Sequence, residues 1–335
     1  MNPLDRQRQL ELVREANRAP SVHNVQPGRW RFLPDGHVLL FEDLGRHLSV
    51  ADPEGRDGRV SLGAEFEGLR IALSRQGLGL RDPDYAPPAA PETSPLRLVA
   101  RSAVVAGDRT DPLAAFVLLR HTYRGRFAPV DDATVETVRV LFEGCPDVIV
   151  ISRPSEIAEI AEVHDRCTYQ FVERAEYHAE LYRWMRFSRR DPAWDRDGLT
   201  ADCLGMSGFE RALASGLFHP RAFRILRTLR LARPLVAEAP QTRSAHAIAI
   251  FHRHRDEDAF AIGRRFYRLW LEVCRAGFSL CPMSAVADSP EGSAWVRQRW
   301  GVPEHAAIVN VLRIGLAPEG ALRASPRLPA EELLV

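Results

Sequence analysis

Residues 61–69 read SLGAEFEGL, and residues 261–269 read AIGRRFYRL, at a constant offset of 200. Both stretches carry a glycine at the third position and apolar residues at the second, sixth and ninth. The correspondence continues through three further pairs: Arg75/Arg275, Gly77/Gly277 and Leu80/Leu280. We therefore interpret the two stretches as copies of one unit within the chain.

Each copy lies in a helical hydrophobic pattern, over residues 58–76 and 259–276. A glycine in the middle of each helix allows another backbone to come close. We therefore predict two related α+β halves that pack about a pseudo-two-fold axis, as a homodimer would.

The patterns around the two copies predict further elements. Before the second copy we expect helices at 3–18 and 131–143, strands at 37–42, 96–106 and 147–152, and a long helical region over 154–190. Residues 82–95 hold five prolines and are expected to form a connector, whereas 191–234 looks irregular with short helices. After it, strands are expected at 246–252 and 306–315, with a helix at 291–300.

Composition narrows the functional classes. The chain has 335 residues, 45% of them hydrophobic, enough for two domain-sized units. Its formal net charge of +1 gives no overall field that favours nucleic acid or an acidic membrane, and the arginines of 183–233 are interleaved with aspartates, which suggests ion pairing. Five cysteines lack a CxxC pair, and no apolar run approaches membrane-spanning length. We expect a cytoplasmic protein.

A polar ledge occupies residues 18–32, RAPSVHNVQPGRWRF. Pro20 and Pro27 fix the backbone at two points. Between them stand the donors and acceptors Ser21, His23, Asn24 and Gln26. The stretch either presents these groups to a ligand or forms a loop that caps a helix and satisfies its own backbone.

A second polar cluster, residues 120–127, reads RHTYRGRF. Arginine forks bind phosphate in a bidentate manner, and a Thr hydroxyl with nearby backbone N–H groups would complete an anion site. The alternative is a solvated basic turn. Residues 281–285, CPMSA, form a turn suited to presenting backbone N–H groups, and Arg313 stands in a largely apolar strand, where either an acid partner or a ligand phosphate would explain it.

Together these motifs resemble the nitroreductase superfamily of flavin proteins, and within it the single-chain, internally duplicated Acg-type branch. The resemblance runs from the ledge through SLGA, RHTYRGRF and PMSA to the final VLRIG strand. It includes residues 184–206, WMRFSRRDPAWDRDGLTADCLGM, which look like that branch's inserted lid. It implies a first half at 1–110 and a second half at 111–335, with the lid inserted at about 180–235, and an α+β fold with antiparallel central sheets flanked by helices.

The resemblance also implies one FMN site at the junction of the halves, because the first half keeps PSVHNVQP and the second keeps RHTYR. By carry-over, Arg120, Thr122 and Arg313 would bind phosphate, and Arg124 would lie near flavin N1 and O2, with His121 in the same motif. The opposite wall would come from Pro20, Ser21, Asn24 and Gln26, and Ser284 would offer its N–H to flavin N5, flanked by Pro282, Met283 and Ala285. His23 is either a flavin or substrate contact or a structural histidine.

One position departs from the family's QPW motif: Gly28 stands where the family has Trp, although Trp30 follows two residues later. The expected function is NAD(P)H-dependent reduction of nitro compounds, quinones or similar acceptors through FMN, by a monomer that can dimerise further. No side chain is required as an acid or base. If the lid seals the flavin, the protein would instead sequester it, and a third option is a flavin-modifying enzyme.

Other classes lack their signatures. The chain has no GxGxxG after a strand and no GxxxxGK[ST], so neither a Rossmann site nor a P-loop is indicated. Gly205-Met206-Ser207-Gly208 does not have the spacing of a nucleophile elbow. His164, Cys167 and His178 are expected to be helix surface residues rather than metal ligands, since no fourth ligand is evident.

Overall fold

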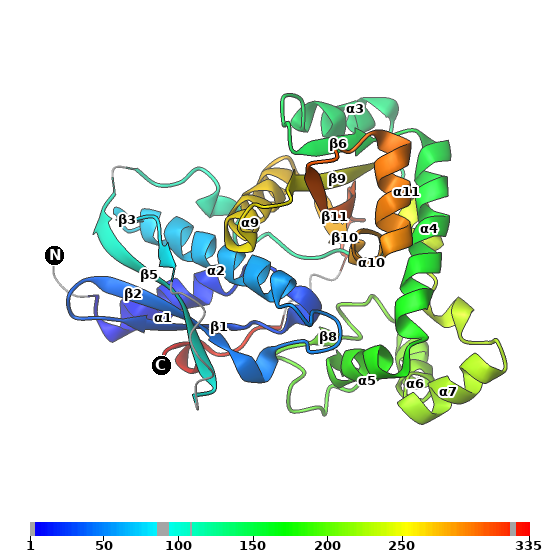
Figure 1. Cartoon of the computed structure of the whole chain (residues 1–335), viewed down its shortest axis with the longest axis horizontal. Helices are drawn as coiled ribbons and strands as arrows, with labels where there is room; N and C mark the ends of the chain where they lie inside the picture. The colour runs from blue at the N-terminus through cyan, green and yellow to red at the C-terminus, as the bar shows by residue number, and fades with distance from the viewer. Residues whose placement is uncertain (1–3, 86–93, 108, 322–325) are drawn as a thin grey trace.

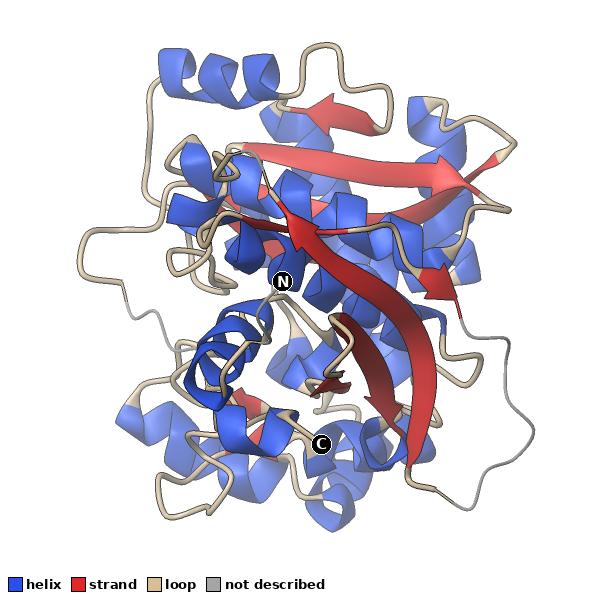
Figure 2. Ribbon diagram, turned by 90° about the vertical axis from the view of Figure 1, so that its left-hand side faces the viewer, coloured by secondary structure: helices blue, strands red, loops and turns tan. Residues whose placement is uncertain are grey.

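The computed structural model describes residues 4–85, 94–107, 109–321 and 326–335. Its architecture rests on two antiparallel sheets, one of five strands and one of four, which are surrounded by helices (Figures 1 and 2). The α+β class predicted from the sequence is thereby confirmed. Part of the predicted 82–95 connector, residues 86–93, lies outside the described residues, and the short strand β4 (Asp84–Tyr85) begins it.

The two sheets have the same order of equivalent strands. The first runs β1 (Gly28–Phe32), β2 (His37–Asp43), β5 (Leu96–Ala106), β3 (Leu78–Leu80), with β4 on β5. The second runs β6 (Val148–Ile151), β9 (Ala247–His254), β11 (Ala306–Gly315), β10 (Ser279–Pro282). Each pairing along both paths is antiparallel. Each sheet also carries one long helix between its second and third strands in chain order, α2 (Arg56–Ser74) and α9 (Ala259–Arg275).

The remaining helices lie around these units. In the described chain they are α1 (Arg6–Ala16), α3 (Asp132–Leu141), α4 (Pro154–Val172), α5 (Ala175–Arg183), α6 (Gly208–Leu217), α7 (Pro220–Thr228), α8 (Ala239–Arg243), α10 (Ser284–Asp288), α11 (Pro290–Trp300) and α12 (Ala330–Leu333). Their ends follow local chemistry. The Asp5 and Asp131 side chains cap α1 and α3 by accepting backbone N–H bonds.

Helices α2 and α9 cross at the centre of the molecule (Figure 1). A Cβ added at Gly63 would lie 2.0 Å from the carbonyl oxygen of Phe260, and one added at Gly263 would lie 1.9 Å from that of Val60. The contact is reciprocal, since 63 meets 260 and 263 meets 60 at the same offset of 200. The two helices therefore meet backbone to backbone. The repeated glycines predicted a close backbone neighbour for each helix, and that neighbour is the other helix of the pair.

The end of the chain returns to the first sheet. Leu328, Ala330, Leu333 and Leu334 join the core formed by α1, α2 and the first sheet, beside the fully buried Trp30. The Val335 amide donates to the Trp30 carbonyl. A chain that has entered the second sheet thus closes back onto its own beginning.

Two expectations for the middle of the chain are corrected. The long helical region predicted over 154–190 is divided at Glu173–Arg174 into α4 and α5 and ends at Arg183. His164, Cys167 and His178 are buried rather than on the helix surface. Most charged residues of α4 and α5 occupy the outer faces, with the buried Glu180 as an exception, so the periodicity was amphipathic rather than solvent-exposed throughout.

We define the lid as residues 180–235, keeping the predicted bounds. It contains the end of α5, the two-stranded parallel pair β7 (Met185–Arg186) and β8 (Leu199–Thr200), and helices α6 and α7. In Figure 1 these elements lie at the lower right, beside the first sheet and below α4. Among the described residues, no helix is both long enough and apolar enough to span a bilayer.

The helix crossing makes a first prediction. Gly63→Ala should lower the free energy of unfolding by about 3 kcal/mol, because its methyl group cannot fit against the Phe260 carbonyl without moving a helix. The measurement is urea denaturation. Gly216→Ala is the matched control: it lies in α6 with nothing within 4 Å, and should stabilise by about 0.5 to 1 kcal/mol. Equal effects at both positions would contradict the tight crossing.

Candidate functional site

A cleft with a volume of about 190 Å³ opens beside the helix crossing, between elements that flank the two sheets and residues of the lid. Helices α2 and α9 supply its floor through Val60, Ser61, Phe266 and Trp270. The ledge and the 120–124 segment face it from different halves, and the lid and the C-terminal segment also line it. The predicted site residues among the lining are Pro20, Ser21, His23, Asn24, Arg120, Thr122, Arg124, Pro282 and Ser284.

The ledge has an unusual backbone. His23, Asn24 and Gln26 have φ angles of 48°, 58° and 53°, in the left-handed region that non-glycine residues rarely adopt. Val22–Asn24 forms a short 3₁₀ turn, and the Ser21 hydroxyl accepts a hydrogen bond from the Gln26 amide at 3.0 Å. Such a conformation is maintained only where the surroundings fix it.

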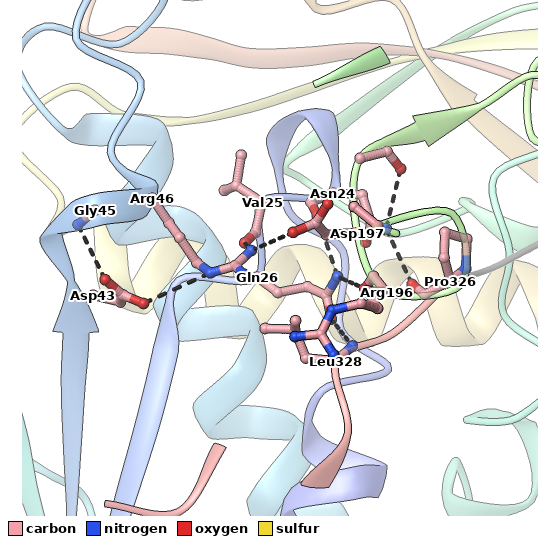
Figure 3. Close-up of polar contacts among 12 residues, drawn as sticks. Asn24, Val25, Gln26, Asp43, Gly45, Arg46, Arg196, Asp197, Pro326 and Leu328 are labelled. Carbon is pink, nitrogen blue, oxygen red and sulfur yellow. Dashed lines mark hydrogen bonds and ion pairs between the residues drawn. The ribbon is translucent and has the colours of Figure 1, made fainter. Parts of the chain in front are cut away.

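The Gln26 side chain supplies much of that fixation (Figure 3). It is buried, and its oxygen accepts from Asn17 and from the Leu328 amide, both at 2.8 Å. Its amide group donates to the carbonyl of Arg196 at 2.9 Å. Gln26 therefore does not line the cleft: it joins α1, the lid and the C-terminal segment behind the ledge.

Asn24 lines the cleft and also crosses to the lid. Its amide group donates to the carbonyls of Gly198 at 3.3 Å and Pro326 at 3.1 Å. Its oxygen accepts from Arg327 at 3.0 Å, and its backbone carbonyl accepts from the Gly198 amide at 3.3 Å. The lid is thus hydrogen-bonded directly to the ledge (Figure 3).

Two further attachments hold the lid on the first half. The buried Glu180 carboxylate accepts from the Val50 and Ala51 amides, at 3.1 and 2.8 Å. Asp197 forms ion pairs with Arg46 at 3.0 Å and Arg186 at 2.7 Å. Because these contacts are buried or half-buried, they fix the lid more firmly than exposed pairs would.

Arg120 is the most informative of the predicted residues. It is 4% exposed, and its guanidinium lies over the Trp270 ring, 4.8 Å from the centroid. Nε donates to the Arg18 carbonyl at 2.9 Å, whereas the buried Nη1 has no hydrogen-bond partner among the described residues. Burial lowers the pKa of Arg120. A buried cation with an orphaned N–H calls for an anion at this place.

Arg327 is a lining residue that sequence reasoning missed. It donates to the Arg18 carbonyl at 3.3 Å, on the same carbonyl as Arg120. Burial, and then the charges of Arg120 and Arg18, lower the pKa of Arg327 to about 9. Within the described residues no carboxylate forms an ion pair with Arg18, Arg120 or Arg327. The sequence offered one signal for this residue: Arg327 stands between Pro326 and Pro329, after the last motif that was recognised.

The remaining members of the second cluster divide. Thr122 and Arg124 line the cleft, whereas His121 is buried, with Nδ1 3.0 Å from the Leu119 carbonyl. Arg313 is fully buried and lies outside the lining residues. It donates to the Arg124 carbonyl at 2.7 Å and lies 3.4 Å from Glu238, so the structure gives it the acid partner that the sequence left open.

The 281–285 turn also divides. Pro282 and Ser284 line the cleft, and the Ser284 amide begins α10, where a helix has no internal acceptor to offer. Met283 and Ala285 instead pack into the core beside the second sheet, and the Met283 amide donates a hydrogen bond to the Val311 carbonyl. Two carboxyl groups not foreseen, Asp57 and Asp288, complete this part of the lining.

Two side chains that line the cleft, His23 and Asp57, have shifted pKa values. Burial, and then the charge of Arg124, lower the pKa of His23 to about 4, so its imidazole is neutral near pH 7, and Nε2 has no hydrogen-bond partner in the described chain. Burial and the Asp52 charge raise the pKa of Asp57 to about 6. Within the described residues, no group of His, Cys, Asp and Glu could hold a metal ion.

No family model matches the chain. The chain is, however, 26% identical over 340 aligned positions to the protein of Mycobacterium tuberculosis named "Putative NAD(P)H nitroreductase acg", covering 96% of this chain and 93% of that one. It is 25% identical to an uncharacterised protein of the same organism, covering 95% and 90%. The resemblance to the nitroreductase superfamily is confirmed.

Solved structures with lower identity include the FMN-dependent nitroreductase NfnB of Mycobacterium smegmatis, in complex with NADPH. It is 19% identical, at a TM-score of 0.36, covering 64% of this nitroreductase-like chain and 91% of that one. A BluB-like flavoprotein of Clostridium difficile is 12% identical, at a TM-score of 0.38, covering 67% and 98%.

The departure at Gly28 has a physical explanation in this nitroreductase-like chain. A Cβ at Gly28 would lie 1.7 Å from the Glu65 Oε2, so a side chain there would displace the Glu65 carboxyl group. Glu65 is 2% exposed and accepts a hydrogen bond from the Gly28 amide. Trp30 does not take the place of the family Trp, because its ring is buried in the core of the first sheet.

This arrangement makes a second prediction. Burial raises the pKa of Glu65 from 4.5 to about 7. The protonated form is therefore favoured in the folded state, and its stabilising effect, present below about pH 4.5, is lost as pH rises through 7. Glu65→Gln should remove this loss, and should gain about 3 kcal/mol of unfolding free energy over the parent between pH 4.5 and 8.

Urea denaturation at several pH values measures the difference. Glu180→Gln is the control, because that carboxylate accepts backbone N–H bonds and its loss should not be recovered at high pH. A pH-independent difference for Glu65→Gln would show that Glu65 is ionised in the folded protein throughout this range.

Proposed function

We propose that this chain is an FMN-dependent NAD(P)H oxidoreductase whose single flavin site is the cleft between the two halves. One observation carries the proposal: Arg120 and Arg327 line the cleft with Arg18 beside them, and no carboxylate is paired to any of the three among the described residues. Like charges brought together in a half-buried place raise the free energy of the folded state unless an anion joins them. A phosphate group supplies that charge.

The residues fit this cofactor in kind. Arg120 and Arg327, with the Thr122 hydroxyl, would hold the phosphate, and Arg124 would lie at the N1 and O2 edge of the flavin ring. Pro20, Ser21, His23 and Asn24 would form the opposite wall, and the Ser284 amide would donate to N5. Trp270, beneath Arg120, adds an aromatic surface at the same end.

Five predicted contacts then act from behind the cleft. Gln26 holds the ledge in its left-handed conformation, and Arg313 holds the Arg124 backbone. His121 is bonded to its own turn, and Met283 and Ala285 support the 281–285 turn from the core. Their roles in the proposal are positioning ones.

Bound FMN supplies hydride chemistry, taking electrons from NAD(P)H and passing them to a nitro compound, a quinone or a similar acceptor. The chain's contribution is to orient the ring, place Arg124 where reduced flavin becomes negative, and limit access through the lid. The neutral imidazole of His23 leaves the positive charge at the cleft to the arginines. Halves at 1–110 and 111–335, the lid as an insertion between them, a monomer and a cytoplasmic location belong to the same proposal.

A second candidate is a flavin-sequestering protein. Its supporting observation is the set of hydrogen bonds that tie the lid to the ledge through Asn24, Gln26, Arg196 and Gly198. A lid held in this way could keep nicotinamide from the flavin face. A flavin-modifying enzyme, the third option, has no contact among the described residues that favours it.

Anaerobic reduction separates the candidates. We expect purified protein to be yellow, to lose its absorbance near the flavin maximum when NAD(P)H is added, and to recover it with a nitroaromatic or a quinone. Retained flavin without bleaching would favour sequestration. Protein that takes up no FMN would contradict both.

The arginine pair makes a further prediction. Arg120→Ala and Arg327→Ala should each weaken FMN binding by about 10- to 100-fold, the range for a hydrogen bond to a charged group, and should leave riboflavin affinity within about 2-fold, because riboflavin lacks the phosphate. Fluorescence titration measures both dissociation constants. Arg126→Ala is the matched control, since that exposed arginine belongs to the same motif but does not line the cleft.

Equal weakening of FMN and riboflavin would refute the phosphate role and leave a positioning one. An unchanged FMN affinity would refute both.

A further inference from the structure

The outer surface of the lid carries a patch of exposed arginines and large apolar side chains. Residues 221–233 expose four arginines and three large apolar side chains to solvent. We call these residues the basic apolar face: Arg221, Arg224, Ile225, Leu229, Arg230, Leu231 and Arg233. The exposed fractions of Ile225, Leu229 and Leu231 are 59%, 60% and 56%.

Local packing fixes which side of α7 faces outward. Phe223 is buried, and its ring stacks on the imidazole of His178 in α5 with centroids 4.0 Å apart. Leu226 packs in the same cluster. At 100° per residue, Arg221, Arg224 and Ile225 lie on the side of the helix away from Phe223 and Leu226. α7 is therefore anchored by one face and exposes these three residues with the other. The rest of the basic apolar face, Leu229, Arg230, Leu231 and Arg233, lies in the exposed segment that follows the end of α7 at Thr228.

The charge of this surface is not compensated locally. The sequence analysis expected the arginines of 183–233 to pair with interleaved aspartates, and this holds for Arg186 with Asp197 and for Arg189 with Asp202. From 211 to 237 the sequence has six arginines and no Asp or Glu. Among the described residues, none of the four arginines of the basic apolar face forms an ion pair. The ion-pairing prediction is therefore wrong for 221–233.

We propose that the basic apolar face docks on an anionic lipid surface. A bilayer with acidic headgroups offers negative charge to the arginines and an apolar layer, a few ångströms deeper, to Ile225, Leu229 and Leu231. The mixture of the two residue types on one exposed surface is what such an interface requires. The contact is peripheral: α7 has nine residues, and it lies along the surface rather than across it.

Two other occupants match the surface less well. A second copy of the chain about a two-fold axis would bring four arginines against four, which like-charge repulsion opposes. Nucleic acid would neutralise the arginines, but its phosphates would leave three large apolar side chains facing charge and water. An acidic bilayer matches both components.

The lid joins this surface to the cleft. Its inner loop lines the cleft through Gly198, Leu199 and Cys203, while α7 and the segment after it carry the basic apolar face. Docking would thus bring the lid side of the cleft toward the membrane, where lipid-dissolved acceptors reside. The docking itself does not depend on the proposed function and can be tested on protein with or without flavin.

Vesicle sedimentation of the full chain tests the proposal. We expect it to pellet at low salt with vesicles of equal parts phosphatidylglycerol and phosphatidylcholine, to bind vesicles of phosphatidylcholine alone at least about 10-fold more weakly, and to dissociate as salt rises. Arg221→Glu/Arg224→Glu should weaken binding to the acidic vesicles by at least about 10-fold. Ile225→Ser/Leu229→Ser should weaken it by a similar factor while keeping the net charge.

Arg6→Glu/Arg109→Glu is the matched control. Both residues are exposed, lie outside the lid and change the net charge by the same amount. This variant should bind within about 2-fold of the parent. An equal loss of binding in the control would overturn the proposal and indicate a net-charge effect. A parent chain that stays in the supernatant with acidic vesicles would overturn the proposal outright.

A dimer in solution that Ile225→Ser/Leu229→Ser abolishes would assign the face to a second copy instead. If duplex DNA displaces the vesicles, and the Ile225→Ser/Leu229→Ser variant binds that DNA as tightly as the parent does, the basic apolar face is assigned to nucleic acid. Circular dichroism and thermal unfolding of each variant check that the overall fold is retained, which is expected because all four substituted side chains are exposed.

Discussion

The close approach of α2 and α9 is the constraint from which the rest of the structure follows. Glycines 200 residues apart allow each helix to touch the other's backbone, so the two sheets are held at one separation and in one orientation. The same crossing supplies the floor of the cleft through residues one turn away. Packing and site geometry are therefore set by one contact, and a methyl group there would disturb both.

The lid adds a second layer of order. It is covalently continuous with the second half through α4, yet its hydrogen bonds go to the ledge and to the 48–51 turn of the first half. It thereby acts as a strap across the junction. Three left-handed residues in the ledge are stable because this strap, α1 and the C-terminal segment all bind the ledge's side chains and carbonyls.

Local patterns predicted most elements well, because hydrophobic periodicity and caps such as Asp131 are short-range properties. The paired glycines also predicted that another backbone lies close to each helix, although they did not predict that the two helices contact each other. What failed depended on tertiary surroundings. His164 looked like a surface residue because its neighbours are charged, and Arg327 could not be found because it joins Arg120 only through folding. Gly28 became intelligible only once Glu65 was seen to fill its space.

The return of the C-terminal segment to the first half also orders events during biosynthesis. Arg327 and Leu328 reach α1 and the ledge across about 300 residues of sequence, so the cleft lacks one wall while a nascent polypeptide is still being extended on the ribosome. Halves that could each begin to collapse co-translationally must wait for this late segment before the charge cluster is assembled. Any ligand held between Arg120 and Arg327 could therefore be captured only after translation has passed the last motif.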